Sequence, residues 1–132
     1  MIETQEAKTG ILEVLIVDDE AGFTEILAKR MLLRGIRVTR THSGSEAIRT
    51  LRNTDFHCAV LDLKLEDMDG IDVLKIFKKM VPDMPVIMLT GHGCEDSARE
   101  GMSLGAAAYL IKPCGIEQLT ATIRETIGNH HG

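Results

Sequence analysis

The feature that most constrains the fold is the regular alternation of short apolar runs with segments of helical periodicity along the 132 residues. The apolar runs are 11–17, 36–41, 58–63, 85–90 and 107–111. Four of them are nearly all apolar, which is typical of strands covered on both faces, whereas 36–41 alternates and should lie at a sheet edge. This order predicts a doubly wound α/β fold, in which a five-stranded parallel sheet carries five helices on its two faces.

The weakest of the predicted helices is the fourth, over residues 95–104. Its apolar face comprises little more than Ala98, Met102 and Leu104, and its interior contains Gly101. Glycine inside a helix costs about 1 kcal/mol relative to alanine. A helix that buries so little should belong to the least stable part of the fold.

The other four helical segments have clear apolar stripes and recognisable ends. Ser43 or Ser45 can cap the second helix, Asp69-Gly70 opens the third, and Gly128 is a suitable residue to end the last. The stripes are Phe23, Ile26, Leu27 and Met31; Ala47, Ile48 and Leu51; Ile71, Leu74 and Phe77; and Ile116, Leu119, Ile123 and Ile127.

Composition excludes several classes of protein. Aromatic residues make up only 3% of the chain and the net charge is −5, so neither a base-stacking platform nor a basic nucleic-acid surface is expected. No apolar stretch is long enough to span a membrane, and the polar N-terminal residues do not resemble a signal peptide. The three cysteines lack metal-ligand spacing, so we expect reduced thiols in a cytoplasmic protein.

Polar residues of only three types stand where four of the predicted strands end. Asp18-Asp19 follows the first run, Asp62 the third, Thr90 the fourth and Lys112 the fifth. Ligands of open parallel sheets bind beyond the carboxyl ends of the strands. These side chains should therefore meet at one edge of the sheet and form the functional site.

The chemistry that these residue types favour is phosphoryl transfer to a carboxylate. Asp62 is the candidate nucleophile, because a carboxylate can attack phosphorus and form an aspartyl phosphate. The adjacent carboxylates of the first strand end can hold Mg²⁺, or Mn²⁺, together with Asp62 and a backbone carbonyl. Lys112, the Thr90 hydroxyl and the Gly91 amide can each contact a phosphoryl oxygen.

At these motifs the chain resembles the response-regulator receiver domains of two-component signalling, and in particular the single-domain chemotaxis regulators. The resemblance covers roughly residues 11–127 and implies a single flavodoxin-like domain flanked by flexible tails over 1–10 and 128–132. Each motif is weak alone, but the ordered set is specific. The matching segments are 17–20, 61–63, 69–70, 89–91 and 105–113.

The resemblance implies a role for each residue at the acidic end of the site. Asp62 resembles the phosphoacceptor. Asp18 and Asp19 resemble the Mg²⁺ carboxylates, and the backbone carbonyl of Lys64 resembles the remaining protein ligand. The domain would catalyse only its own phosphorylation and dephosphorylation, and is therefore not expected to be an enzyme.

The resemblance also implies a conformational switch. Lys112 resembles the phosphate-binding lysine, and its bond to Pro113 is expected to be cis. Thr90 resembles the switch hydroxyl and Tyr109 the aromatic switch residue. Phosphorylation would draw Thr90 inward, so that Tyr109 swings and the surface of the fourth helix, fifth strand and last helix changes.

The implied partners are proteins. A sensor histidine kinase or a phosphotransfer protein would supply the phosphoryl group, and a downstream protein target or a second copy of the chain would read the switched surface. Neither direct nucleic-acid binding nor membrane insertion is expected. The Leu-Thr-Gly-His-Gly sequence at 89–93 resembles receivers that precede transcriptional output domains.

Cys114 departs from the family pattern, and Lys64 and His92 leave the lifetime of the phosphoryl group undetermined. Cys114 stands where the family usually has phenylalanine, which could loosen the packing beside Lys112. Lys64 and His92 each lie two residues beyond a site residue. The resemblance implies that these positions flank the phosphoryl group and tune its hydrolysis, as they do in the family. The lifetime of the phosphoryl group is therefore open.

Two other functions compete with this interpretation. The first is a constitutive interaction module that no longer depends on phosphorylation. The second is a Mg²⁺-dependent aspartyl phosphohydrolase of the haloacid-dehalogenase type. That enzyme needs a second aspartate two residues after the nucleophile, where this chain has Lys64, and a cap insertion for which the chain has no room.

Overall fold

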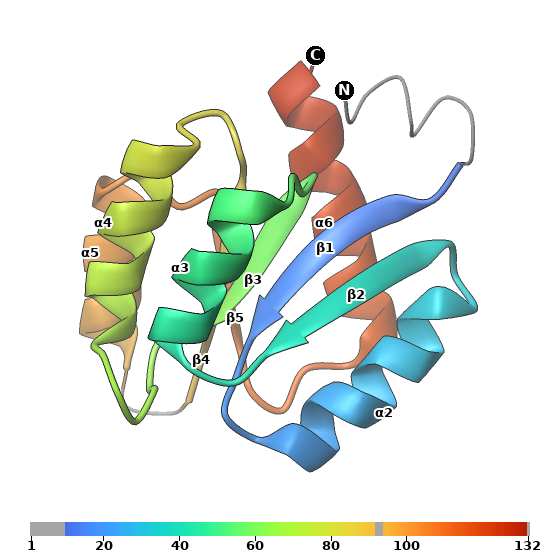
Figure 1. The fold of residues 1–132 in the computed structure, drawn as a ribbon, viewed down its shortest axis with the longest axis horizontal. Helices are drawn as coiled ribbons and strands as arrows, with labels where there is room; N and C mark the ends of the chain where they lie inside the picture. Colours follow the sequence, from blue (N-terminus) through green and yellow to red (C-terminus); the bar gives the residue numbers. More distant parts are fainter. Residues whose placement is uncertain (1–9, 92–93, 132) are drawn as a thin grey trace.

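The computed structural model describes residues 10–91 and 94–131, with the side chains of 129–131 left aside. Five strands alternate with five helices over this part of the chain (Figure 1). The strands are β1 (Leu12–Val17), β2 (Ile36–Thr41), β3 (Cys58–Asp62), β4 (Val86–Thr90) and β5 (Ala108–Ile111). The helices are α2 (Ala21–Leu32), α3 (Gly44–Asn53), α4 (Gly70–Met80), α5 (Glu95–Ser103) and α6 (Ile116–His131).

All strands are parallel and lie in the order β2-β1-β3-β4-β5, which confirms the predicted doubly wound α/β fold. Successive residues of β1 serve opposite faces of the sheet. Leu15 and Val17 pack with α3 and α4, whereas Val14 and Ile16 pack with α2 and α6. Two apolar layers therefore enclose the sheet on its two faces.

The two edge strands differ from each other in how well the sequence predicted them. The alternating run 36–41 forms β2 at one edge, as predicted, with Arg37 and Arg40 exposed. The run 107–111 was expected to be covered on both faces, and this was wrong. It forms β5 at the other edge, where the side chains of Tyr109 and Ile111 are each 39% exposed.

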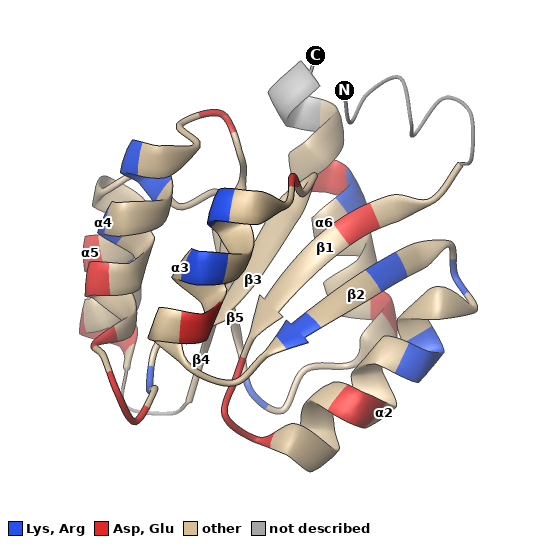
Figure 2. Cartoon of the chain, viewed as in Figure 1, with Lys and Arg blue, Asp and Glu red and all other residues tan. Residues whose placement is uncertain are grey.

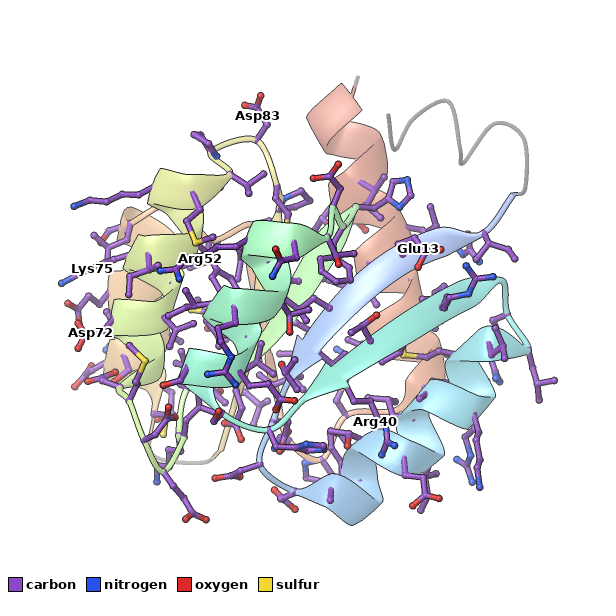
Figure 3. All side chains as sticks on the ribbon, in the orientation of Figure 1. Glu13, Arg40, Arg52, Asp72, Lys75 and Asp83 are labelled. Atoms are coloured by element: carbon purple, nitrogen blue, oxygen red, sulfur yellow. The ribbon has the colours of Figure 1, made fainter. Side chains whose placement is uncertain are left out.

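Helix α4 shows how the apolar stripe sets the orientation of a helix. Ile71 and Phe77 are buried with the rest of the predicted stripe. Asp69 precedes the helix, and its carboxylate accepts a hydrogen bond from the amide of Ile71 at 2.9 Å. The charged side chains Asp72 and Lys75 on the opposite face point away from the sheet (Figure 3).

Other helices depart from their predicted faces or ends. Ile26 is 56% exposed on α2, because the helix turns Thr24 rather than Ile26 toward the core. Helix α6 continues through Gly128 to His131, so the prediction that it ends at Gly128 was wrong. None of the described helices is long and apolar enough to cross a membrane.

Helix α5 also corrects a predicted apolar face. Met102 and Leu104 are 40% and 37% exposed, and the buried positions of the helix are Ala98 and Gly101. A Cβ atom at Gly101 would lie 2.2 Å from the sulfur of Met88, so the missing side chain is what lets α5 approach β4. The helix is therefore attached by small residues, with little apolar area buried.

Candidate phosphoacceptor site

The parallel register brings four strand ends to one edge of the sheet. Asp18 follows β1, Asp62 ends β3, Thr90 ends β4 and Lys112 follows β5. The amide of Lys112 donates to the carbonyl of Thr90 at 2.7 Å, which fixes the exit of β5 beside the exit of β4. Figure 2 shows the acidic segment that leaves β1 at this edge. The predicted convergence of these residues is therefore present in the fold.

The ammonium group of Lys112 lies among three carboxylates. Its Nζ is 2.7 Å from Oδ2 of Asp18, 3.3 Å from Oδ2 of Asp62 and 3.3 Å from Oε1 of Glu20. Asp18 is fully buried and Asp62 is 6% exposed. Burying like charges together is costly unless a cation offsets them, and Lys112 is that cation in this structure.

Backbone amides fix the second oxygen of the two buried carboxylates. Oδ1 of Asp18 accepts from the amide of Glu20 at 2.9 Å, and Oδ1 of Asp62 accepts from the amide of Lys64 at 3.0 Å. Each carboxylate thus has one oxygen held by the turn that follows its strand and one oxygen directed at Lys112. The turns orient the carboxylates before any ligand arrives.

The pKa of each partner reflects burial and charge together. Burial raises the pKa of Asp62 above its ordinary value, and the nearby charge of Asp18 adds to this, whereas the Lys64 amide and Lys112 act in the opposite direction. Burial by itself would lower the pKa of Lys112, but its hydrogen bond to Asp18 and the charges of Asp18 and Asp62 raise it well above the usual range. Lys112 therefore stays cationic.

The acidic group that could hold a metal differs in one member from the predicted set. One carboxylate oxygen each from Asp18, Glu20 and Asp62 lie within 4.8 Å of one another. Oxygen donors so closely grouped suit Mg²⁺ or Mn²⁺, which prefer hard ligands. Asp19 is partly exposed and does not belong to this group. Glu20 was missed, and its only signal in the sequence was its place directly after the aspartate pair.

The switch candidates occupy different environments. Thr90 is 2% exposed at the end of β4, whereas Tyr109 is 39% exposed on the edge strand β5. A Cβ atom at Gly91 would meet no other atom within 4 Å, so the space beside that backbone is open. His92, which we expected to flank the phosphoryl group, lies outside the described residues. The Lys112–Pro113 bond is cis, as expected.

Comparison with known proteins establishes the family. The family model for the response regulator receiver domain matches residues 14–124. The chain belongs to this family. Its members are phosphoacceptors in two-component signalling, and they bind Mg²⁺ at a cluster of aspartates. The predicted resemblance and fold are thereby confirmed.

Several characterised regulators contain a segment similar to this receiver domain. Transcriptional regulatory protein ZraR of Klebsiella oxytoca is 32% identical over 118 residues, which cover 89% of this chain and 27% of that protein. Luminescence regulatory protein LuxO of Vibrio campbellii is 37% identical over 112 residues, which cover 85% and 25% respectively. The chain thus spans about a quarter of the length of these relatives.

Solved structures agree with the receiver fold. A CheY-like receiver domain protein from Methanospirillum hungatei JF-1 superposes with a TM-score of 0.87 at 28% identity, covering 92% of this chain and 97% of the other. A receiver domain protein from Clostridium thermocellum gives a TM-score of 0.85 at 31% identity, covering 90% and 96%. Each superposition covers nearly the whole of the compared receiver domain.

An aromatic ring lies beside the lysine of this receiver domain although residue 114 is cysteine. The ring of Phe23, from α2, lies under the Lys112 ammonium, with 5.0 Å between Nζ and the ring centroid. Cys114 is partly buried and packs with the same apolar layer as Phe23. The sequence identified Phe23 only as a helix-stripe residue, because its approach to Lys112 depends on how α2 packs on the sheet.

Proposed function

We propose that this receiver domain accepts a phosphoryl group on Asp62 in a Mg²⁺-dependent reaction that changes the surface formed by α5, β5 and α6. The observation that carries the proposal is the Lys112 ammonium, which bridges Oδ2 of Asp18 at 2.7 Å and Oδ2 of Asp62 at 3.3 Å. A phosphoryl group attached to Asp62 Oδ2 would bring its negative charge beside this cation.

The reaction divides between the carboxylate and the groups around it. An oxygen of Asp62 attacks the phosphorus of the donor, and the bond from phosphorus to the donor's leaving atom breaks. Asp18, Asp62 and the Lys64 carbonyl would hold Mg²⁺, joined by Glu20, which lies in the same acidic group, and by the partly exposed Asp19. When bound, the ion supplies positive charge for the transferring phosphoryl oxygens. The donor would be a sensor histidine kinase or a phosphotransfer protein.

The switch would follow from the change of charge at Asp62. The Thr90 hydroxyl moves toward a phosphoryl oxygen and vacates space, which Tyr109 then fills from its exposed position on β5. Helix α5 buries little apolar surface, so its arrangement is easily biased. A downstream protein or a second copy of the chain, in the cytoplasm, would read the changed surface.

The decisive experiment is an intact-mass measurement after incubation with acetyl phosphate and Mg²⁺. A single phosphoryl adduct is expected on the wild type and absent from Asp62→Asn and from a sample with EDTA. Beryllofluoride with Mg²⁺, monitored by NMR, covers the case in which the domain does not react with small donors. If neither reagent modifies Asp62 or moves Tyr109, the domain is a constitutive interaction module instead.

A further inference from the structure

The loop between β3 and α4, residues 63–69, directly follows Asp62 along the chain. Its base is closed by a hydrogen bond from the amide of Gly70 to the carbonyl of Leu63 at 3.1 Å, and by an antiparallel bridge between Lys64 and Asp69. At the same end the Lys64 amide donates to Asp62. The position of Lys64 therefore depends on how the whole loop is held.

The tip of this loop is tied to a different helix by Asp67. Oδ1 of Asp67 accepts from the amide of Gly44 at 2.9 Å, and Oδ2 accepts from the amide of Ser45 at 3.0 Å and from its hydroxyl at 2.8 Å. These amides belong to the first turn of α3, where a helix has unpaired donors and favours a negative charge. The three hydrogen bonds lower the pKa of Asp67, so the carboxylate is charged at neutral pH.

Helix α3 already has a cap of its own. The Ser43 hydroxyl accepts from the amide of Glu46 at 3.1 Å, in the usual manner of an N-cap serine. Asp67 satisfies two further amides of the first turn, those of Gly44 and Ser45, from outside the helix. Ser43 and Asp67 thus both stabilise the start of α3, but of these two residues only Asp67 belongs to the loop beside the site.

The contact between the loop and α3 leaves no spare space. A Cβ atom at Gly44 would lie 2.8 Å from the sulfur of Met68 and 2.9 Å from Cγ2 of Val73. Helix α3 therefore meets the loop directly at this point, and the Asp67 hydrogen bonds lie next to a tightly packed contact. The loop is thus held at its base by Gly70 and at its tip by Asp67.

We propose that Asp67 is a positioning residue for the cation site: by holding the loop against α3, it keeps the Lys64 backbone and Asp62 in the arrangement that binds Mg²⁺. The inference rests on the proposed function, in which the Lys64 carbonyl is a metal ligand. Residues that orient metal ligands without touching the metal commonly change its affinity by about 10- to 100-fold when removed.

The test compares Asp67→Ala with the matched control Ser43→Ala, each titrated with Mg²⁺ by NMR at pH 7. Both variants lose hydrogen bonds to the first turn of α3, but only Asp67→Ala releases the loop. We expect the Kd for Mg²⁺ to rise about tenfold in Asp67→Ala and to stay within about twofold of the wild type in Ser43→Ala. Asp67→Asn, which keeps one acceptor oxygen, should give an intermediate value.

Equal Mg²⁺ affinities for Asp67→Ala and Ser43→Ala would overturn the inference while leaving the proposed function intact. If the wild type itself binds no Mg²⁺, the proposed function fails, and the positioning role is then decided by hydrogen exchange of the Lys64 amide in EDTA. Faster exchange in Asp67→Ala than in Ser43→Ala would support the role of Asp67 in holding the loop. Unchanged exchange would overturn it.

Discussion

Replacing Gly70 by alanine should destabilise the domain, although the same replacement usually stabilises a helix. A Cβ atom at Gly70 would lie 2.5 Å from the Cα of Leu63 and 2.7 Å from its carbonyl oxygen. These are backbone atoms directly after the strand that carries Asp62, so they cannot rotate away. Overpacking of this kind costs about 1–3 kcal/mol, or more where the backbone cannot shift.

Gly22→Ala is the matched control for this prediction. Gly22 lies in the first turn of α2, and an added Cβ atom would meet no other atom within 4 Å. The reduced entropy of the unfolded chain should therefore stabilise Gly22→Ala by about 0.4–1 kcal/mol. The same term also acts in Gly70→Ala, so the difference between the variants isolates the contact with Leu63.

Urea unfolding followed by circular dichroism measures both variants. We expect the two midpoints to move in opposite directions and the free energies of unfolding to differ by about 1–3 kcal/mol, the cost of the contact with Leu63. With a slope of about 1–3 kcal/mol per molar urea, a difference of this size is readily resolved. If Gly70→Ala is as stable as Gly22→Ala, the loop after β3 is not tightly packed and the reasoning is refuted.

Two further predictions concern the charge cluster and the buried thiol. Lys112→Gln should lower the free energy of unfolding by about 3 kcal/mol in EDTA, because the buried Asp18 loses its cation. Mg²⁺ can replace that charge, so it should stabilise the variant more than the wild type. Equal stabilisation of the two proteins by Mg²⁺ in urea unfolding would contradict this prediction. Burial raises the pKa of Cys58 from 9.0 to about 12 and also raises the pKa of the partly exposed Cys114. At pH 8 the folded protein should therefore be alkylated at Cys114 before Cys58, because Cys58 is also buried from the reagent, as mass spectrometry would show. The thiol of the unfolded chain ionises at a lower pH than the buried thiol, so the contribution of Cys58 to stability is complete below pH 9 and is lost between pH 9 and about 12. The free energy of unfolding of Cys58→Ala should therefore fall less steeply over this pH range than that of the wild type. An equally steep fall in both proteins would show that Cys58 is not the group responsible.

Most residues of the candidate site could be predicted from their type and their position along the chain. Asp62 and Lys112 could be predicted to lie together because parallel strands end at the same edge of the sheet. Their placement at strand ends follows from the sequence without any knowledge of how the helices pack. Glu20 was not predicted, because its approach to the cluster depends on the turn in which Asp18 accepts the Glu20 amide. Asp67 was missed for a similar reason, since its hydrogen-bond partners lie on another helix.

By itself, the sequence determined the number and type of the elements, the parallel sheet and the strand ends that carry the chemistry, because apolar periodicity and strand alternation are local properties of the chain. Only the tertiary structure decided which strand became the second edge, which side of α5 faces the sheet and which amides the carboxylates satisfy. Those features depend on which apolar side chains of the helices and strands become buried when the helices pack on the sheet. The exposure of Tyr109 and the anchoring of the loop by Asp67 are therefore properties of the assembled fold.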